Sequence, residues 1–536
     1  MKLSLNAIPF YNKVTPTVLT LITAAFLLLT SNHVFFEKLL VIYPLAENMG
    51  FILSVGLLLF CILVLFIAVL SLLVPVRWVC SFFLLTAAVA GFYMDRFGIT
   101  FDDVMLQNIV ETDVSEAADL FSYGLILYVL VLGIFPVIGL WLLKFTPSLW
   151  WRELRYGLQT ALVSIFAMVL CIVSFSDVYA VFSHEHKNLR YYSNPSYAIY
   201  SLGKFITSYS KTVTVTEIKT TSPNADIADT DSGHELIIMV VGETARRDRF
   251  SLNGYARNTN PELSKESRLV SYSHISACGT STAVSVPCMF SMLDHDNYSR
   301  SAASGMENVL DVLARVGVNI LWRDNNSGSK GVADRIPFED FSDKARNPVC
   351  DVECRDVGML QGLQEYIDAQ SGDILIVLHQ MGNHGPAYYK RYPAEFERFT
   401  PACHSAELGQ CSDEEINNAY DNAILYTDYF LAKAIALLKA NTPNYETALL
   451  YVSDHGESLG ENGLYLHGMP YLIAPAEQID VPVIAWVGES SDVDISSALE
   501  LKDVSNSHDA VCHALLDLFE VDSASVSNGP SLFQVN

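Results

Sequence analysis

The sequence predicts a helical membrane domain followed by a water-exposed α/β domain with a mostly parallel sheet. Apolar residues concentrate before residue 180, whereas short β-rich runs alternate with helical patterns after about residue 235. Hydrophobic residues make up 51% of the 536 residues and charged residues only 17%, which is too apolar for a disordered or an ordinary soluble chain. The net charge of −26 argues against a nucleic-acid binder, because such proteins need basic patches that displace phosphate counterions.

Five segments have the roughly 20 apolar residues that a bilayer-spanning helix needs. They cover about residues 14–32, 50–74, 77–95, 122–144 and 156–178. The first segment lacks the small-residue cleavage site of a secretory signal, and four more spans follow it. We therefore expect a retained anchor rather than a removed signal peptide.

Basic residues are distributed unequally between the loops that join these spans. The loops on the side of the N-terminus carry Lys2, Lys13, Arg77, Lys144, Arg152 and Arg155. The opposite loops carry only Lys38 and Arg96 beside several acidic residues. The positive-inside rule then predicts a cytoplasmic N-terminus, and an odd number of spans delivers everything after residue 180 to the far side of the membrane.

Six of the ten cysteines form close pairs along the chain beyond the spans. These pairs are Cys278/Cys288, Cys350/Cys354 and Cys403/Cys411. Disulfides persist in oxidising compartments such as the periplasm, so we expect each pair to be bonded. Reduced thiols or a zinc cluster are the alternatives, and the absence of a Cys-x-x-Cys pair favours the disulfides.

Residues 181–234 differ in composition from the segments on either side. Their first part, LRYYSNPSYAIYSLGKFITSYSK, mixes aromatic, aliphatic and basic residues, as an interfacial segment or a packed connector does. Residues 216–234 are polar and rich in Asp, Ser and Thr, which predicts a flexible bridge. The sequence thus divides into a five-span membrane domain (1–180), interfacial helices with a bridging linker (181–234) and a catalytic domain (235–536).

The β-rich runs of the last part are separated by helical patterns. The runs are ELIIMVVGE, VNILWR, DILIVLHQ, TALLYVSDH and PVIAWVG, and the helical patterns include NVLDVLARVG, GMLQGLQEYIDA and EEINNAYDNAILYTDYFLAKAIALLKAN. Continuous apolar strands alternating with helices indicate a mostly parallel sheet covered on both faces. Ligands of such sheets bind outside the carboxyl ends of the strands.

Two of the predicted strands end in residues that bind metal ions. Glu243 follows LIIMVVG directly, and Asp454 and His455 follow ALLYVS. Two carboxylates and an imidazole suit a catalytic Zn²⁺ site that keeps one position open. For either motif alone, a capping carboxylate or an ordinary buried histidine is the alternative.

A hydroxyl-rich segment, CGTSTAVSVPC at residues 278–288, leads into an apolar helical run. A hydroxyl at a helix N-terminus lies near the positive end of the dipole and the free N–H groups, which favour an anionic group. Simple N-capping is the alternative. Spacing alone does not choose among Thr280, Ser281, Thr282 and Ser285.

Four motifs occur in one order after the five spans: VVGETAR, CGTSTAVSVPCMFS, HQMGNHGP and SDHGESLGENGLYLHG. With these motifs the chain resembles the lipid A phosphoethanolamine transferases, including the mobile colistin-resistance enzymes, within the alkaline-phosphatase/sulfatase superfamily. The resemblance covers essentially the whole chain. It implies a periplasmic α/β/α domain of the alkaline-phosphatase-like (sulfatase-like) fold, attached to the bacterial inner membrane.

The resemblance also implies roles for individual residues. The catalytic threonine of the family falls on Thr282, and its zinc ligands fall on Glu243, Thr282, Asp454 and His455. The remaining positions are His384 and His467 for a second metal or substrate, Asn326 and Lys330 for the substrate phosphate, and Asn108 and Glu116 for the lipid donor. For each of these last six residues, the alternative is that it has no role in the site and is an ordinary polar residue of a loop, of the solvated surface or of the membrane interface.

The function implied is transfer of phosphoethanolamine from phosphatidylethanolamine to a phosphate of lipid A through a covalent phosphoethanolamine-threonine intermediate, with polymyxin resistance as the result. One tightly bound Zn²⁺ is expected, and a second is left open. We expect a monomer whose partners are the phosphatidylethanolamine donor and the lipopolysaccharide acceptor, without nucleic acid.

Three other functions compete with this one. A phosphoethanolamine or glycerol-phosphate transferase acting on another glycan would use the same phosphorus chemistry. A sulfatase is disfavoured, because the stretch from Ser285 to Met289 lacks the arginine of the C/S-x-P-x-R context in which formylglycine is made. A membrane-tethered zinc-binding sensor is the non-enzyme alternative.

Overall fold

The computed structural model describes residues 14–112, 114–144, 150–213, 218–227, 233–442, 444–522 and 529–533. Contacts divide the chain into two compact units. The first comprises residues 1–103 and 121–204, and the second residues 104–120 and 205–536. The segment 104–120, which we expected within the membrane domain, therefore groups with the second unit.

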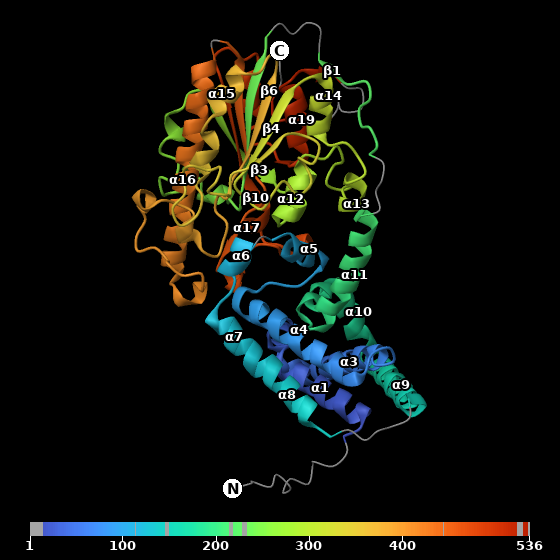
Figure 1. The fold of residues 1–536 in the computed structure, drawn as a ribbon. Helices are drawn as coiled ribbons and strands as arrows, with labels where there is room; N and C mark the ends of the chain where they lie inside the picture. Colours follow the sequence, from blue (N-terminus) through green and yellow to red (C-terminus); the bar gives the residue numbers. More distant parts are fainter. Residues whose placement is uncertain are drawn as a thin grey trace. The chain divides into compact units, whose positions relative to one another are not determined.

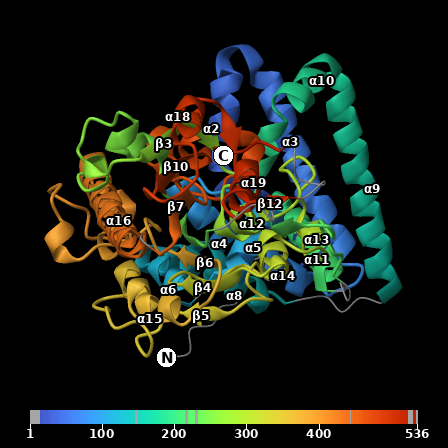
Figure 2. The ribbon, with the colours of Figure 1, turned by 90° about the horizontal axis from the view of Figure 1, so that it is seen from above.

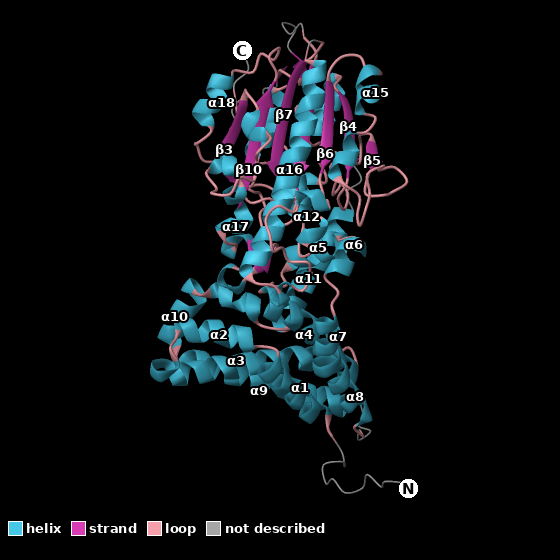
Figure 3. Cartoon of the chain, turned by 90° about the vertical axis from the view of Figure 1, so that its left-hand side faces the viewer, coloured by secondary structure: helices cyan, strands magenta, loops and turns pink. Residues whose placement is uncertain are grey.

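The first unit is built of helices (Figure 3). They are α1 (Pro16–Thr30), α2 (His33–Ile42), α3 (Leu45–Leu70), α4 (Val76–Phe97), α7 (Tyr123–Val129), a π-helical stretch (Leu130–Ile134), α8 (Phe135–Leu142), α9 (Trp150–Ser174), α10 (Ser176–Glu185), a 3₁₀-helix (Lys187–Tyr192) and α11 (Ser196–Val213), whose last turns belong to the second unit. Within the described residues, four helical segments are long and apolar enough to cross a membrane, and a fifth results if α1 and α2 count as one span.

The first predicted span is bent rather than straight. Helices α1 and α2 meet at an angle of 59°, and Asn32 lies between them, 1% exposed. Its Nδ2 donates to the Leu27 carbonyl (3.0 Å) and to the Asn194 carbonyl (2.7 Å), while its Oδ1 accepts from the Asn194 backbone N–H (2.9 Å). The Asn32 side chain thus pairs backbone groups of α1 and of Asn194 at the bend, which offsets the cost of burying them.

An eight-stranded sheet forms the centre of the second unit, in the order β11-β3-β10-β7-β2-β6-β4-β5. The strands are β2 (Glu235–Gly242), β3 (Leu269–Ser276), β4 (Asn319–Asp324), β5 (Phe338–Asp340), β6 (Ile374–His379), β7 (Glu446–Ser453), β10 (Asp480–Val487) and β11 (Asn506–Ser507). Strand β10 runs antiparallel to β3 and β7, and the other pairs are parallel. The mostly parallel sheet and all five predicted strands are confirmed.

Helices cover both faces of this sheet (Figures 1 and 2). Helix α16 (Asp413–Asn441) packs on one face against β2 and β7. On the other face, α12 (Thr282–Met289), α14 (Val309–Val316) and α19 (Asp509–Asp517) share a buried cluster with alternate strand residues such as Met239 and Val241. Both α14 and α16 begin with capping boxes, at Asn308 and Ser412, which satisfy the free N–H groups of their first turns.

Short elements complete the second unit. They are α5 (Asp103–Glu111), α6 (Val114–Asp119), α13 (Arg300–Ala303), α15 (Leu363–Asp368), α17 (Ala476–Ile479), α18 (Ile495–Leu501), the strand pair β1 (Asp226–Ile227) and β12 (Val521–Asp522), and the strand pair β8 (Ser458–Leu459) and β9 (Tyr465–Leu466). Several 3₁₀ turns join them. The three predicted disulfides, Cys278–Cys288, Cys350–Cys354 and Cys403–Cys411, are confirmed.

The described part of the predicted flexible bridge is packed rather than free. Residues 218–227 include β1, and the backbone N–H of Thr221 donates to the Glu307 carboxylate (3.0 Å). Arg315 donates to the carbonyls of Thr221 and Ser222 (2.8 and 3.1 Å). Polar composition predicted flexibility here, but buried hydrogen bonds to α14 and its flank order this stretch. The rest of the predicted bridge, at 216–217 and 228–232, lies outside the described residues.

Gly242 ends β2 at a position where no side chain fits. A Cβ there would lie 2.5 Å from the Tyr451 ring, so we expect Gly242→Ala to destabilise the second unit by about 1–3 kcal/mol. Denaturant unfolding of the full chain in detergent measures this change. Removing the ring with Tyr451→Ala should make the alanine at 242 much less costly, and equal costs with and without the ring would contradict the clash.

Candidate active site

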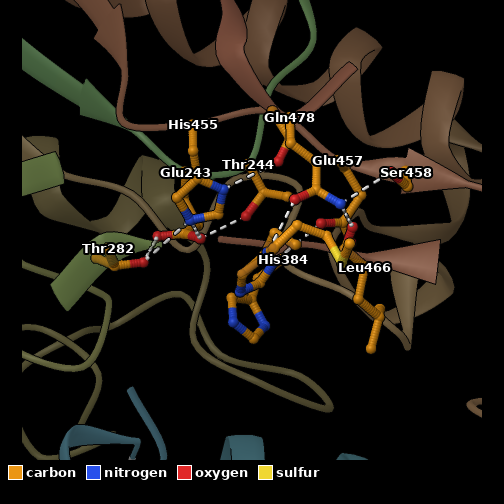
Figure 4. Close-up of polar contacts among 12 residues, drawn as sticks. Glu243, Thr244, Thr282, His384, His455, Glu457, Ser458, Leu466 and Gln478 are labelled. Carbon is orange, nitrogen blue, oxygen red and sulfur yellow. Dashed lines mark hydrogen bonds and ion pairs between the residues drawn. The ribbon is translucent and has the colours of Figure 1, made fainter. Parts of the chain in front are cut away.

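The carboxyl ends of β2 and β7 bring together three side chains of the kinds that bind metal ions. The two strands are parallel neighbours, and Gly242 pairs with Ser453, so Glu243 and Asp454 leave the sheet side by side. One ligand atom each of Glu243, Asp454 and His455 lies within 4.8 Å of the others. All three side chains are fully buried, and Figure 4 shows Glu243 and His455 in contact distance of Thr282.

Hydrogen bonding fixes which nitrogen of His455 is available. Its Nδ1 lies 2.9 Å from the Gly456 carbonyl, and because a carbonyl oxygen only accepts, Nδ1 carries the proton. The lone pair is then on Nε2, which lies 3.5 Å from Glu243 Oε1 and 3.3 Å from Asp454 Oδ2. This tautomer is the one that binds a metal through Nε2.

The charges of the cluster favour the binding of a cation. Burial, followed by the negative charge of Glu243, raises the pKa of Asp454 to about 7. Burial also raises the pKa of Glu243, but His455, His384 and His467 together lower it well below its usual value. Asp454 Oδ2 is buried and has no hydrogen-bond partner in the described part of the chain. Two carboxylates, one with an unsatisfied oxygen, and an imidazole lone pair fit a divalent ion such as Zn²⁺.

Two hydroxyls contact Glu243, that of Thr244 at Oε1 and that of Thr282 at Oε2, and of these Thr282 belongs to the hydroxyl-rich motif. Thr282 is the first residue of α12 and is 5% exposed. Its Oγ1 donates to Glu243 Oε2 (3.1 Å) and lies 3.4 Å from His455 Nε2. Thr280 instead donates to the Met469 carbonyl (2.6 Å). The geometry therefore distinguishes the hydroxyls that the spacing of the motif left open.

Asn326 also contacts the cluster, from the loop after β4. Its Nδ2 donates to Glu243 Oε2 (2.9 Å) and to the Gln380 carbonyl (2.8 Å). Asp324 shapes this loop by accepting from the backbone N–H groups of Asn326 (2.9 Å) and Gly328 (3.0 Å), and it pairs with His379 Nδ1 (2.9 Å). The ends of β4 and β6 thereby orient one ligand carboxylate of the neighbouring strand.

A second polar cluster lies next to the first and contains both further predicted histidines; Figure 4 shows His384 and Glu457 of this cluster. The His467 ring centroid lies 4.3 Å from that of His455 and 5.4 Å from that of His384. His467 Nδ1 lies 2.8 Å from Glu457 Oε2, and Tyr388 donates to Glu457 Oε1 (2.6 Å). Burial raises the pKa of the Glu457 carboxyl to about 8. Sequence reasoning missed Glu457, although its position two residues after His455 within SDHGES was a usable signal.

Lys330 lies in the same loop as Asn326 but has different partners. Its Nζ donates to the Ser327 hydroxyl (2.7 Å), to the Ser327 carbonyl (3.0 Å) and to the Glu111 carbonyl (3.2 Å). Among the described contacts, none joins Lys330 to Thr282 or to the three metal-binding residues. Its three partners are neutral oxygens, so its charge is available to an anion.

The segment α5–α6 supplies the last predicted residues. Asn108 is half-buried in α5, and its neighbour Gln107 donates to the Ala283 carbonyl in α12 (3.1 Å). Glu111 pairs with Arg300 (2.8 Å). The side chain of Glu116 lies outside the described residues, although its backbone is part of α6.

Comparisons with known proteins agree with this geometry. A sulfatase family model matches residues 235–521, and a model described as phosphoethanolamine transferase EptA/EptB matches residues 59–209. The chain is 42% identical to the phosphatidylethanolamine transferase Mcr-2 of Escherichia coli, over 97% of this chain and 98% of that protein. It is 36% identical to phosphoethanolamine transferase EptA of E. coli K12, over 88% and 86% of the two chains.

A full-length structure is similar as well. The integral membrane lipooligosaccharide phosphoethanolamine transferase A of Neisseria meningitidis superimposes with a TM-score of 0.90 at 30% identity, covering 96% of this chain and 97% of that one. A helical membrane part and a sulfatase-like α/β part are thus common to both chains, and the predicted fold class is confirmed.

Gly382 packs against the backbone of Glu243. Its φ is +52°, and a Cβ there would lie 2.8 Å from the Glu243 carbonyl oxygen. We expect Gly382→Ala to displace Glu243 and weaken metal binding about 10- to 100-fold, as changes around metal ligands do. Metal content after dialysis against graded chelator measures the effect.

Gly254 provides the matched control for this replacement. Its φ is +91°, but nothing lies within 4 Å of its Cβ position, so Gly254→Ala strains the backbone without touching a ligand. Equal metal retention in the two variants would show that the contact of Gly382 with Glu243 does not matter.

Proposed function

Because this chain belongs to the phosphoethanolamine transferase EptA/EptB family, with a sulfatase-type catalytic fold, we propose that it transfers phosphoethanolamine from phosphatidylethanolamine to a phosphate of lipid A. The observation that carries the proposal is the single hydroxyl of Thr282 placed against Glu243 and His455. A buried hydroxyl at a helix N-terminus, beside a set of metal ligands, is the arrangement of an activated nucleophile.

In the first half-reaction, Thr282 Oγ1 attacks the phosphorus of the donor. The hydroxyl proton passes toward Glu243 Oε2, which already accepts its hydrogen bond. The bond between phosphorus and the diacylglycerol oxygen breaks, and phosphoethanolamine remains on Thr282. The diacylglycerol oxygen takes up a proton, for which we propose His467, whose ring is oriented by the contact of its Nδ1 with Glu457 (2.8 Å).

In the second half-reaction, a phosphate oxygen of lipid A attacks the same phosphorus. The bond from phosphorus to Thr282 Oγ1 breaks, and the threonine regains its proton. Lys330 and Asn326 offset negative charge on the phosphoryl oxygens. Asn108 and Glu116 are proposed to handle the lipid donor, which agrees with the packing of α5 beside α12.

We propose that one Zn²⁺ is held by Glu243, Asp454 and His455 together with Thr282. A second ion or the substrate is proposed to bind at His384 and His467. Bound Zn²⁺ supplies Lewis acidity that lowers the pKa of a hydroxyl and offsets phosphoryl charge. The chain itself supplies the buried carboxylates and a histidine whose Nε2 lone pair faces them.

The protein is an integral membrane protein, and we place it in the bacterial inner membrane. The proposed arrangement has a cytoplasmic N-terminus and a periplasmic catalytic domain, with the parts divided at 1–180, 181–234 and 235–536. The three disulfides suit an oxidising compartment. A monomer is proposed, since one chain contains every residue that the mechanism uses.

Thr282→Ala should abolish the transfer, because the attacking oxygen is lost. We expect a fall of at least about 10³-fold in transfer rate, while the metal is still retained by Glu243, Asp454 and His455. Intact mass after incubation with donor alone should show one phosphoethanolamine adduct on the parent protein and none on this variant, whereas Thr282→Ser should retain a slower adduct. An adduct on another residue of Thr282→Ala would refute the assignment.

Lipid A of expressing cells should gain phosphoethanolamine, and the gain should reduce its negative charge and the binding of polymyxin. Mass spectrometry of extracted lipid A measures the addition, with cells that express Thr282→Ala as the control. If lipid A stays unmodified while another glycan gains phosphoethanolamine, that glycan is the acceptor in place of lipid A. The proposed chemistry at phosphorus would still hold.

A further inference from the structure

The membrane unit contains a cavity that the transfer mechanism does not use. It has a volume of about 640 Å³, within the roughly 300–1,000 Å³ of typical ligand pockets. Its walls are apolar side chains of α2, α3 and α9, namely Phe35, Val55, Leu58, Leu59, Ile62 and Ile172. Because these helices include segments apolar enough to span a membrane, the cavity opens among groups that favour a hydrocarbon chain.

One end of the same cavity is basic. His186, Lys187 and Arg190 line it, from the turn after α10 and the following 3₁₀-helix. Lys187 and Arg190 are exposed, and neither forms an ion pair with an acidic side chain among the described residues. This turn follows α10, the short helix after the last span, and basic side chains near the end of a span are suited to meet lipid headgroups.

Charge decides which headgroup fits. The described lining contains three basic residues and no aspartate or glutamate, while the hydroxyls of Ser183 and Ser193 add hydrogen-bonding groups. A phosphate with a net negative headgroup gains from both exposed cations. A zwitterionic headgroup brings an amine that finds no counter-charge in this lining, so it gains less.

We propose that this cavity binds an anionic glycerophospholipid, whose phosphate contacts Lys187 and Arg190 and whose acyl chain lies along α3 between Phe35 and Ile172. The bound lipid is distinct from the zwitterionic donor and is not consumed. It fills the space between α3 and α10 and stabilises the membrane unit by its preferential binding to the folded form. The proposal goes beyond phosphoethanolamine transfer and does not depend on it.

Native mass spectrometry of the full chain in mild detergent tests the proposal with two probes at equal concentration, phosphatidylglycerol and phosphatidylethanolamine. We expect phosphatidylglycerol to be retained preferentially. Replacing both cations in Lys187→Ala/Arg190→Ala should weaken its binding roughly 10- to 30-fold, and thermal stabilisation by phosphatidylglycerol should disappear in parallel. Both replaced residues are exposed, so the variant should fold.

The control is Arg152→Ala/Arg155→Ala, which removes the same charge from the exposed first turns of α9 and should retain phosphatidylglycerol fully. A second variant, Ala180→Phe, fills the cavity from its α10 wall and should exclude the lipid while leaving both cations in place.

An equal loss of phosphatidylglycerol binding in the two charge variants would show a general attraction of the lipid to surface charge and would overturn the proposal. Preferential retention of phosphatidylethanolamine would overturn it in favour of a donor site.

Discussion

The parallel pairing of β2 with β7 is the constraint on which the catalytic unit depends. Its register aligns Gly242 with Ser453, so the next residues of both strands, Glu243 and Asp454, emerge together into a buried space. Two carboxylates in one low-dielectric position repel each other, which a protein tolerates only where a positive group compensates. The fold thus creates a cation requirement before any particular metal is considered.

The surrounding elements serve this one pair of strand ends. The glycine at 382 lets the loop after β6 approach the backbone of Glu243, and Asp324 turns the loop after β4 so that Asn326 reaches the same carboxylate. Helix α12 enters from the opposite face of the sheet with its first residue aimed at the pair. Each of these contacts comes from a different connection between strands of the sheet. This explains why residues far apart in the sequence lie in one site.

Much of this could be predicted from sequence, because buried parallel strands are continuous apolar runs and their ends carry the polar residues. Strand β3 was missed since LVSYSHIS is half polar and not a continuous apolar run, although its alternation of buried and partly buried positions is typical of a half-buried strand. The choice of Thr282 over its neighbours needed the direction in which α12 enters. Glu457 was missed although it stands two residues after His455, because its burial and its contact with His467 become visible only in the structure.

The placement of residues 104–120 in the second unit was also beyond sequence reasoning. Their membrane-flanking position predicted a membrane loop, but charge pairing decides otherwise: Glu111 binds Arg300, and Asp119 binds Lys390 and Arg391. Local composition reports whether a segment is polar, whereas these distant cations determine which unit it joins.

The cross-link between Cys278 and Cys288 has a consequence for how the enzyme matures. It closes the eleven-residue stretch 278–288, which contains Thr282 and most of α12, so the proposed nucleophile belongs to a ring of covalent bonds rather than to an open chain. A newly exported chain therefore has its reactive oxygen held in this ring only after thiol oxidation. The placement of Thr282 beside Glu243 is thereby coupled to thiol oxidation, so the oxidative folding machinery of the compartment that holds this domain takes part in forming the site.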